Sequence, residues 1–165
     1  MRKQDEKYFD DLTETELLAL CIEREAGGEA YEGKVAVGTV VLERVDHRDW
    51  DGKTIKEVIL KPWQFSWTMP EAGAAYYDQS VELARNFQVH IQENESLQTC
   101  MKIADGMITG AIPRDPDLAG VHCCEYVAGK YRKHMDAHPM EPCNRWWQRM
   151  KLFKVIARHE FYIKG

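Results

Sequence analysis

The pattern of apolar and polar positions predicts a helix that carries a carboxylate on its buried face. Between residues 17 and 25, apolar side chains recur at i, i+1, i+4 and i+5, which is one stripe of a helix with 3.6 residues per turn. Glu25 falls at i+8, on the same stripe. Glu23 points off the stripe, where it can stay in water. The pattern therefore singles out Glu25.

Local signals set the ends of this helix. Residues 13–16 have the spacing of a capping box, so we expect the helix to begin at Glu14. The pair Gly27-Gly28 disfavours helix and can supply a left-handed cap, which places Glu25 in the last turn.

A second helix is expected over residues 31–45. This segment is apolar nearly all round, and its length without a turn signal favours a buried helix over a buried strand. Ala36 and Gly38 would let another helix approach closely. We expect this helix to lie behind the first one and to hold Glu25 in place.

The expected surroundings of Glu25 suit a general acid. The helix dipole is negative at its carboxyl end, the apolar stripe disfavours charge, and Glu29 adds a second carboxylate nearby. All three effects favour the protonated form that a general acid needs. The alternative is an amphipathic helix whose glutamate is merely solvated at a frayed end.

The rest of the chain is read as mostly helical with a small sheet. Residues 1–12 are expected to form an exposed lead-in. The other predicted elements are a helix to residue 60 stopped by Pro62, an extended aromatic stretch over 63–67, a loop over 71–75, helices over 78–92 and 95–108, and a turn over 113–117. Strand-like segments over 121–127 and 153–162 are expected to pair antiparallel across an irregular loop over 129–149.

These elements predict one domain, residues 1–165, of the α+β class. A net charge of −5 with dispersed basic residues argues against nucleic-acid binding. No apolar run is long enough to span a membrane, and residues 1–11 have no apolar core of a secretory signal, so we expect a protein made in the cytoplasm, without membrane insertion, and monomeric.

The histidines and cysteines of the last third raise the alternative of a metal site. The candidates are His122, Cys123, Cys124, His134, His138 and Cys143. Within this set, only His134 and His138 have the spacing of a zinc-ligand pair, and the adjacent cysteines would point to opposite faces of a strand. We therefore expect no metal and no cofactor, and we keep a non-enzymatic, zinc-stapled interaction module as the alternative function.

Three motifs in order resemble the spore-cortex-lytic and cell wall hydrolase family with its SleB-type catalytic domain. Residues 25–37 resemble the signature E-A-R-G-E-x-Y-x-G-Q-x-A-V, with Gly27 in place of arginine. Residues 58–66 resemble V-I-x-x-x-x-A-F-[ST], and residues 156–162 resemble I-G-x-H-x-F-Y.

The resemblance implies a lysozyme-like, lytic-transglycosylase-like fold acting on peptidoglycan. It implies Glu25 as the catalytic acid and base, and a cut between N-acetylmuramic acid and N-acetylglucosamine. A lytic transglycosylase needs one such carboxylate because the muramic acid 6-hydroxyl is the nucleophile; a muramidase using water is the alternative. A lone domain of this kind suggests a phage-type endolysin that reaches the wall after release or as a virion component.

Substrate contacts are expected from groups that suit a sugar. Aromatic planes beside amide and hydroxyl groups match the flat C–H faces and hydroxyl rims of a glycan. The candidates are Glu29, Gln64, Phe65, Ser66, Trp67, Tyr126, His159 and Tyr162. The alternative for Phe65 and Trp67 is that both are core residues.

Overall fold

Helices build most of the structure. The computed structural model describes residues 3–46, 52–62, 64–119, 125–128, 150–156 and 159–164. The α-helices are α1 (Lys3–Asp10), α2 (Glu14–Ala26), α3 (Tyr31–Asp46), α4 (Ile55–Leu60), α5 (Ala74–Arg85), α6 (Phe87–Glu93) and α7 (Glu95–Thr109). Short 3-10 turns are η1 (Ser66–Thr68), η2 (Pro70–Ala72) and η3 (Pro116–Leu118). The strands are β1 (Glu125–Ala128), β2 (Met150–Ile156) and β3 (His159–Lys164).

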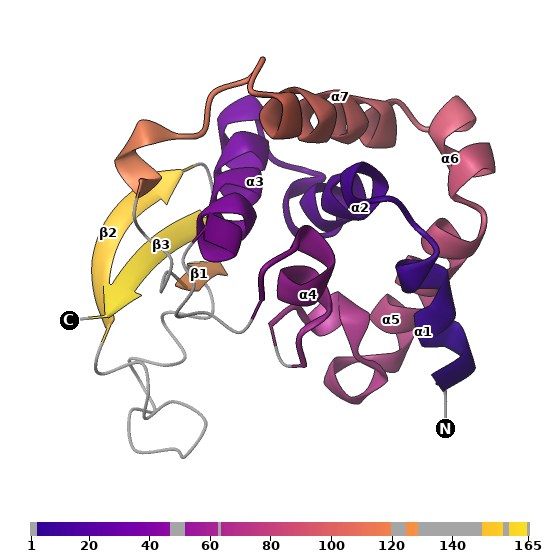
Figure 1. Ribbon diagram of the computed structural model, residues 1–165. Coiled ribbons are helices and arrows are strands. Elements are labelled where there is room, and N and C mark those ends of the chain that lie inside the picture. The colour runs from indigo at the N-terminus through magenta and orange to yellow at the C-terminus, as the bar shows by residue number, and fades with distance from the viewer. Residues whose placement is uncertain are drawn as a thin grey trace.

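Helix α2 runs through the middle of the helical body and contacts α3, α4, α5 and α7 (Figure 1). Every side chain from Leu17 to Ile22 is fully buried, so this part of the helix is buried on all sides and not only along the predicted apolar stripe. The predicted capping box is confirmed: the Thr13 backbone N–H donates to Glu16 Oε2 at 2.8 Å, and the Glu16 N–H donates to Thr13 Oγ1 at 3.1 Å. Local sequence thus fixes where this central helix begins.

Helix α3 is buried along almost its whole length and packs on α2 and α7, as predicted. Gly38 allows the close approach. A Cβ built there would lie 2.6 Å from Met107 Sδ on α7 and 3.5 Å from Ile22 Cδ1 on α2. The absence of a side chain at this one position therefore lets three helices meet.

The prediction of an exposed lead-in over residues 1–12 is wrong. Residues 3–10 form α1, and Phe9 and Leu12 are 1% and 5% exposed. The Phe9 ring packs edge-on against Trp67 at a centroid distance of 5.6 Å and against Tyr77 at 6.1 Å. This aromatic contact fixes α1 to the body.

Two further boundaries differ from the prediction. The expected loop over residues 71–75 contains η2 and the start of α5. The expected helix over 78–92 is interrupted at Asn86, whose φ of −113° and ψ of 32° lie outside the helical region. The break separates α5 from α6. The apolar pattern continues across Asn86, so periodicity alone did not reveal it.

The predicted α+β, lysozyme-like class needs correction to a helical domain. From residue 3 to residue 119 the described chain contains only helices and turns, and the hydrophobic core is built by helices and the turns between them. The strands follow this body as an antiparallel sheet of order β1-β3-β2 beside α3 (Figure 1). The predicted single strand over 153–162 is instead two strands, β2 and β3, that pair with each other, while β3 also pairs with β1.

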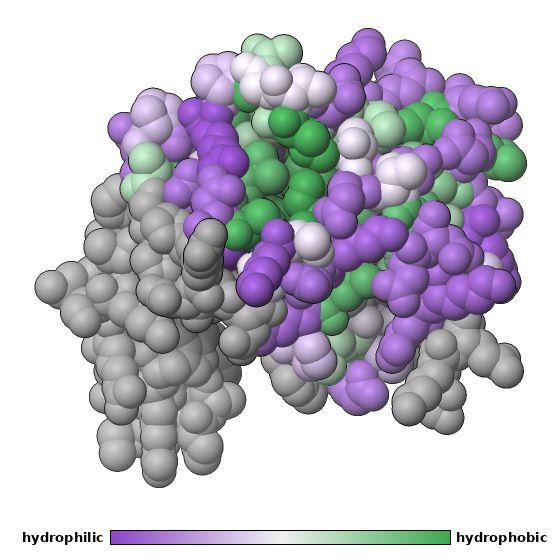
Figure 2. All heavy atoms as spheres, in the orientation of Figure 1, coloured by the Kyte–Doolittle hydropathy of each residue, from purple (hydrophilic) through white to green (hydrophobic). Residues whose placement is uncertain are grey.

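Surface polarity varies over the face shown in Figure 2. Hydrophobic residues gather in its middle, beside α3, and hydrophilic residues cover the lower right, where α1 and α5 lie. Among the described helices, none is both long enough and apolar enough to cross a membrane.

Candidate active site

Glu25 lies in the last turn of α2 and is half-buried. Its charge acts on two neighbours. Burial, followed by the charge of Glu25, raises the pKa of the Cys21 thiol one turn earlier on α2. The same two causes, in the same order, raise the pKa of Tyr76 on α5. The Glu25 carboxylate therefore lies near the buried thiol of Cys21 and the half-buried Tyr76.

Tyr76 and Arg24 tie this end of α2 to α5. The Tyr76 hydroxyl donates to the carbonyl oxygen of Arg24. The Arg24 guanidinium lies 4.1 Å from the centre of the Tyr76 ring, and its Nη2 is 3.5 Å from the Tyr76 carbonyl oxygen and 3.4 Å from Gln79 Oε1. The residue that precedes Glu25 is thus held from both its backbone and its side chain.

A buried lysine caps the carboxyl end of α2. Lys34 is 6% exposed, and its Nζ donates to the carbonyl oxygens of Ala26 at 2.9 Å, Gly27 at 3.0 Å and Glu29 at 2.6 Å. The expected left-handed glycine cap is wrong, since Gly27 has φ −55° and ψ −39°. The expected unopposed negative end of the helix also needs correction, because a cation occupies it.

The sequence suggested that Glu23 is simply solvated, but the structure gives it hydrogen-bond partners. Its Oε2 accepts a hydrogen bond from Ser96 Oγ at 2.7 Å and one from Cys100 Sγ at 3.3 Å, both from α7. Burial and then the charge of Glu23 raise the pKa of Cys100 to about 12. Glu23 therefore joins α2 to α7, and the two glutamates of this turn have different partners.

The aromatic stretch divides between core and surface. Phe65 and Trp67 are 3% and 0% exposed and belong to the hydrophobic core, which agrees with the alternative interpretation of these two rings. Gln64 is half-buried and Ser66 is exposed in η1. Within the stretch over 64–67, Gln64 and Ser66 remain placed for contact with a ligand.

Arg44 links the aromatic stretch to α2. Its Cζ lies 5.8 Å from the centre of the Phe65 ring, and its charge lowers the pKa of Cys21. Arg44 is 2% exposed. The stretch over 64–67 therefore reaches the neighbourhood of Glu25 through a buried arginine of α3.

The remaining predicted contacts are placed only in part. Glu29 is half-buried in the turn between α2 and α3. Tyr126 pairs with Phe161, Tyr162 pairs with Glu125, and His159 pairs with Ala128 in the β1–β3 ladder. Trp63 and all six candidate metal ligands lie outside the described residues. Within the described part of the chain, no three metal-ligating side chains come together.

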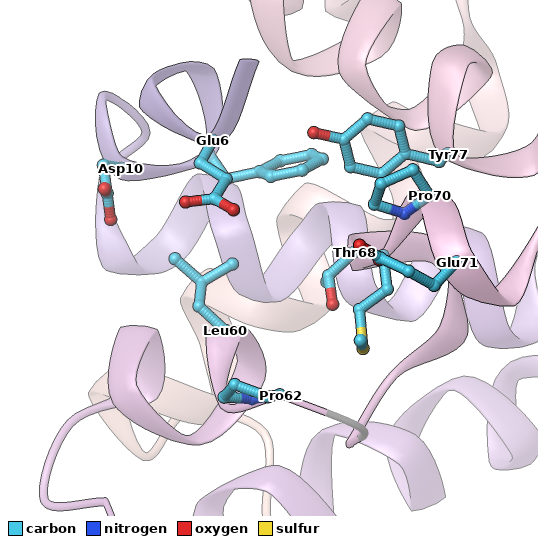
Figure 3. Close-up of a pocket in the computed structure, with 10 residues that line it drawn as sticks. Glu6, Asp10, Leu60, Pro62, Thr68, Pro70, Glu71 and Tyr77 are labelled. Carbon is cyan, nitrogen blue, oxygen red and sulfur yellow. The ribbon is translucent and has the colours of Figure 1, made fainter. Parts of the chain in front are cut away.

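A separate pocket of about 290 Å³ opens between α1, the end of α4, the η turns and α5 (Figure 3). Phe9 and Tyr77 contribute its aromatic wall, and Glu6, Asp10 and Glu71 its acidic rim. None of the predicted site residues lines it. It adjoins elements of the site at α5, where Tyr77 follows Tyr76, and at η1, where Thr68 follows Trp67.

Sequence reasoning missed Lys34 and the pair Arg24–Tyr76. The sequence did contain a hint for Lys34. A lysine in the first turn of a helix is disfavoured by that helix's dipole, which indicates that its ammonium interacts with a group outside the helix. The contact of Arg24 with Tyr76 spans 52 positions and leaves no local pattern.

One comparison with known proteins gives a match. A family model described as Cell Wall Hydrolase matches residues 28–162 of the 165-residue chain. The match includes Glu29, Lys34 and the strands, and it begins just after Glu25. The comparisons with curated proteins and with solved structures gave no match.

Proposed function

Because the chain belongs to the cell wall hydrolase family, a family that degrades peptidoglycan, we propose that it cuts the glycan strand with Glu25 as the catalytic group. The bond is the one between N-acetylmuramic acid and N-acetylglucosamine. The observation that carries the proposal is the position of Glu25. It is half-buried in the last turn of α2, whose centre from Leu17 to Ile22 is fully buried, and hydrogen bonds hold the backbone on either side of it.

The proposed reaction is a lytic transglycosylation. Glu25 gives its proton to the glycosidic oxygen as the bond to C1 of the muramic acid breaks. The same carboxylate then takes the proton of that sugar's 6-hydroxyl while the hydroxyl oxygen attacks C1. The product is a 1,6-anhydromuramoyl end, no water is consumed, and Glu25 returns to its protonated form. One carboxylate suffices, whereas hydrolysis commonly uses two.

The surroundings support the role of Glu25 in both steps. A half-buried carboxylate beside Cys21 and Tyr76 is less well solvated than a free one, which assists protonation before cleavage. Arg44, whose charge also acts on Cys21, brings a cation to this neighbourhood, and a cation stabilises the ionised carboxylate that forms after the proton is given up.

The test is Glu25→Gln, which keeps the size of the side chain and removes its transferable proton. We expect turnover of purified peptidoglycan to fall at least about a hundredfold, the lower end for general acid–base catalysis, with an unchanged melting temperature. Glu93→Gln, at an exposed position at the end of α6, is the matched control and should keep wild-type turnover. Wild-type activity in folded Glu25→Gln would reject the assignment.

Mass analysis of the released fragments distinguishes the two reactions. An anhydro end is lighter than a reducing end by one water, so a transglycosylase and a muramidase leave different masses on the same strand. We expect anhydro ends. Reducing muramic acid ends that incorporate ¹⁸O from labelled water would instead assign a muramidase on the same glutamate.

The protein must also reach the cell wall in order to act on it. We propose an endolysin-type protein that reaches the wall after release from the cytoplasm or as a virion component, acting as a monomer. The proposed reaction uses only Glu25 and the 6-hydroxyl of the substrate, so it calls for no partner chain, cofactor or metal.

A further inference from the structure

Lys34 belongs to α3 but serves the end of α2. It stands in the first turn of α3, where the helix dipole disfavours a cation, and its side chain is 94% buried, since 6% is exposed. An ammonium has three N–H donors, and each has an acceptor: the carbonyl oxygens of Ala26, Gly27 and Glu29 at 2.6–3.0 Å. A buried lysine with every donor satisfied is a built feature of the turn rather than a surface charge.

The three acceptors belong to the turn that directly follows Glu25. Two are carbonyls at the end of α2, and the third lies beyond Gly28, before α3 begins. One ammonium therefore closes residues 26–29 into a fixed loop. Arg24 on the other side is held by Tyr76, so the backbone is fixed immediately before and after Glu25.

We propose that Lys34 is a positioning residue of the active site: it fixes the backbone that carries Glu25 by capping the carboxyl end of α2. This inference rests on the proposed function of Glu25. Lys34 does not touch the substrate. It acts through the carbonyls that it holds.

The charge reaches beyond these carbonyls. It lowers the pKa of Cys100 on α7, so it is felt across the helix interface. The other titratable and charged groups around the end of α2 are Cys21, Glu23 and Arg24 on α2, Glu29 in the following turn, Arg44 on α3 and Tyr76 on α5. The Lys34 charge is thus felt on the side of this turn where Cys100 and Glu23 meet.

Lys34→Gln separates positioning from simple folding. Glutamine is the residue of the signature at this position and can still donate to one or two carbonyls, but it has no charge. We expect kcat to fall severalfold with KM unchanged, because the backbone that carries Glu25 is then less well fixed. A merely structural role would lower the melting temperature and leave the kcat of the folded protein at the wild-type value.

Two variants complete the test. Lys34→Arg keeps several donors at this position and should keep the wild-type kcat and KM; it also carries the test if the glutamine variant does not fold, since a severalfold loss of kcat in folded Lys34→Arg would overturn the proposal. Lys102→Gln makes the same exchange at an exposed lysine of α7 and should match wild type throughout. An unchanged kcat in folded Lys34→Gln would also overturn it. Failure of wild-type protein to cut peptidoglycan would instead reject the function itself.

Discussion

At the scale of single residues, neighbours decide what each carboxylate of α2 can do. Glu23 accepts hydrogen bonds from Ser96 and Cys100, which commits its oxygen to the α2–α7 contact. Glu25, two residues on, lies on the side of Tyr76 and Cys21. The sequence placed the two on different faces of α2, and their partners differ, although Glu23 is not left in water as expected. Glu23 would nevertheless be a poor control for catalysis, because its replacement also disturbs packing.

Cys100 gives a prediction about alkaline stability. Burial, the charge of Glu23 and the hydrogen bond to Glu23 raise its pKa from 9.0 to about 12. A group whose pKa is raised on folding stabilises the native state fully below its unfolded pKa and loses that contribution as the pH rises toward the folded value. The free energy of unfolding should therefore fall between pH 9 and 12.

Urea unfolding of Cys100→Ser at pH 8 to 11 checks this. Serine can still donate to Glu23 but does not titrate, so its denaturation midpoint should fall less steeply with pH than that of the wild type. Part of the decline stays in both proteins, since burial also raises the pKa of Cys21. Parallel curves for the two proteins would contradict the prediction.

At the scale of elements, Phe9 is the buried aromatic anchor of α1. Phe9 is 1% exposed and touches Trp67 and Tyr77. Phe9→Ala should lower the free energy of unfolding by about 3–5 kcal/mol, the usual cost of deleting a buried ring. Lys7→Ala, at an exposed position of the same helix, should change it little. A similar small effect for both, in chemical denaturation, would mean that α1 is not anchored through Phe9.

Elements with long patterns or explicit caps were predictable, including the short α4 with its cap at Thr54, whereas α1 and the division of the last strand were not. Helices α2, α3 and α7 combine an apolar pattern over 13, 16 and 15 residues with recognisable ends or with burial all round. Helix α1 has 8 residues and too few apolar positions to form a stripe. The division of residues 150–164 into β2 and β3 was missed because Ala157-Arg158 carries no turn signal in sequence.

The site was predictable where it depended on one helix and not where it depended on contacts between helices. Periodicity placed Glu25 because one helix face determines it. Burial of Phe65 and Trp67 depends on how α1 and η1 pack, which no local pattern contains. The capping role of Lys34 was missed because a lysine is expected in water, and only the fold brings three carbonyls to its ammonium.

At the scale of the whole molecule, the arrangement of helices predicts a gradient of stability. Helix α2 contacts α3, α4, α5 and α7 and is fully buried from Leu17 to Ile22, whereas α6 has only Phe87 buried. Amides exchange through local opening where few apolar contacts hold an element, and through global unfolding where many do. The central amides of α2 should therefore exchange with the free energy of global unfolding, and those of α6 with a smaller one.

Native-state hydrogen exchange followed by mass spectrometry or NMR tests this gradient. The outcome bears on the proposed catalysis, because Glu25 lies in the last turn of the helix that is expected to be most protected, and a catalytic group gains rate when its position is fixed before substrate binds. In Lys34→Gln, amides of residues 26–29 should exchange faster while those of residues 18–22 stay as slow as in the wild type. Equal protection of α2 and α6, or faster exchange along all of α2 in that variant, would show that the end of α2 is not fixed separately from its buried centre.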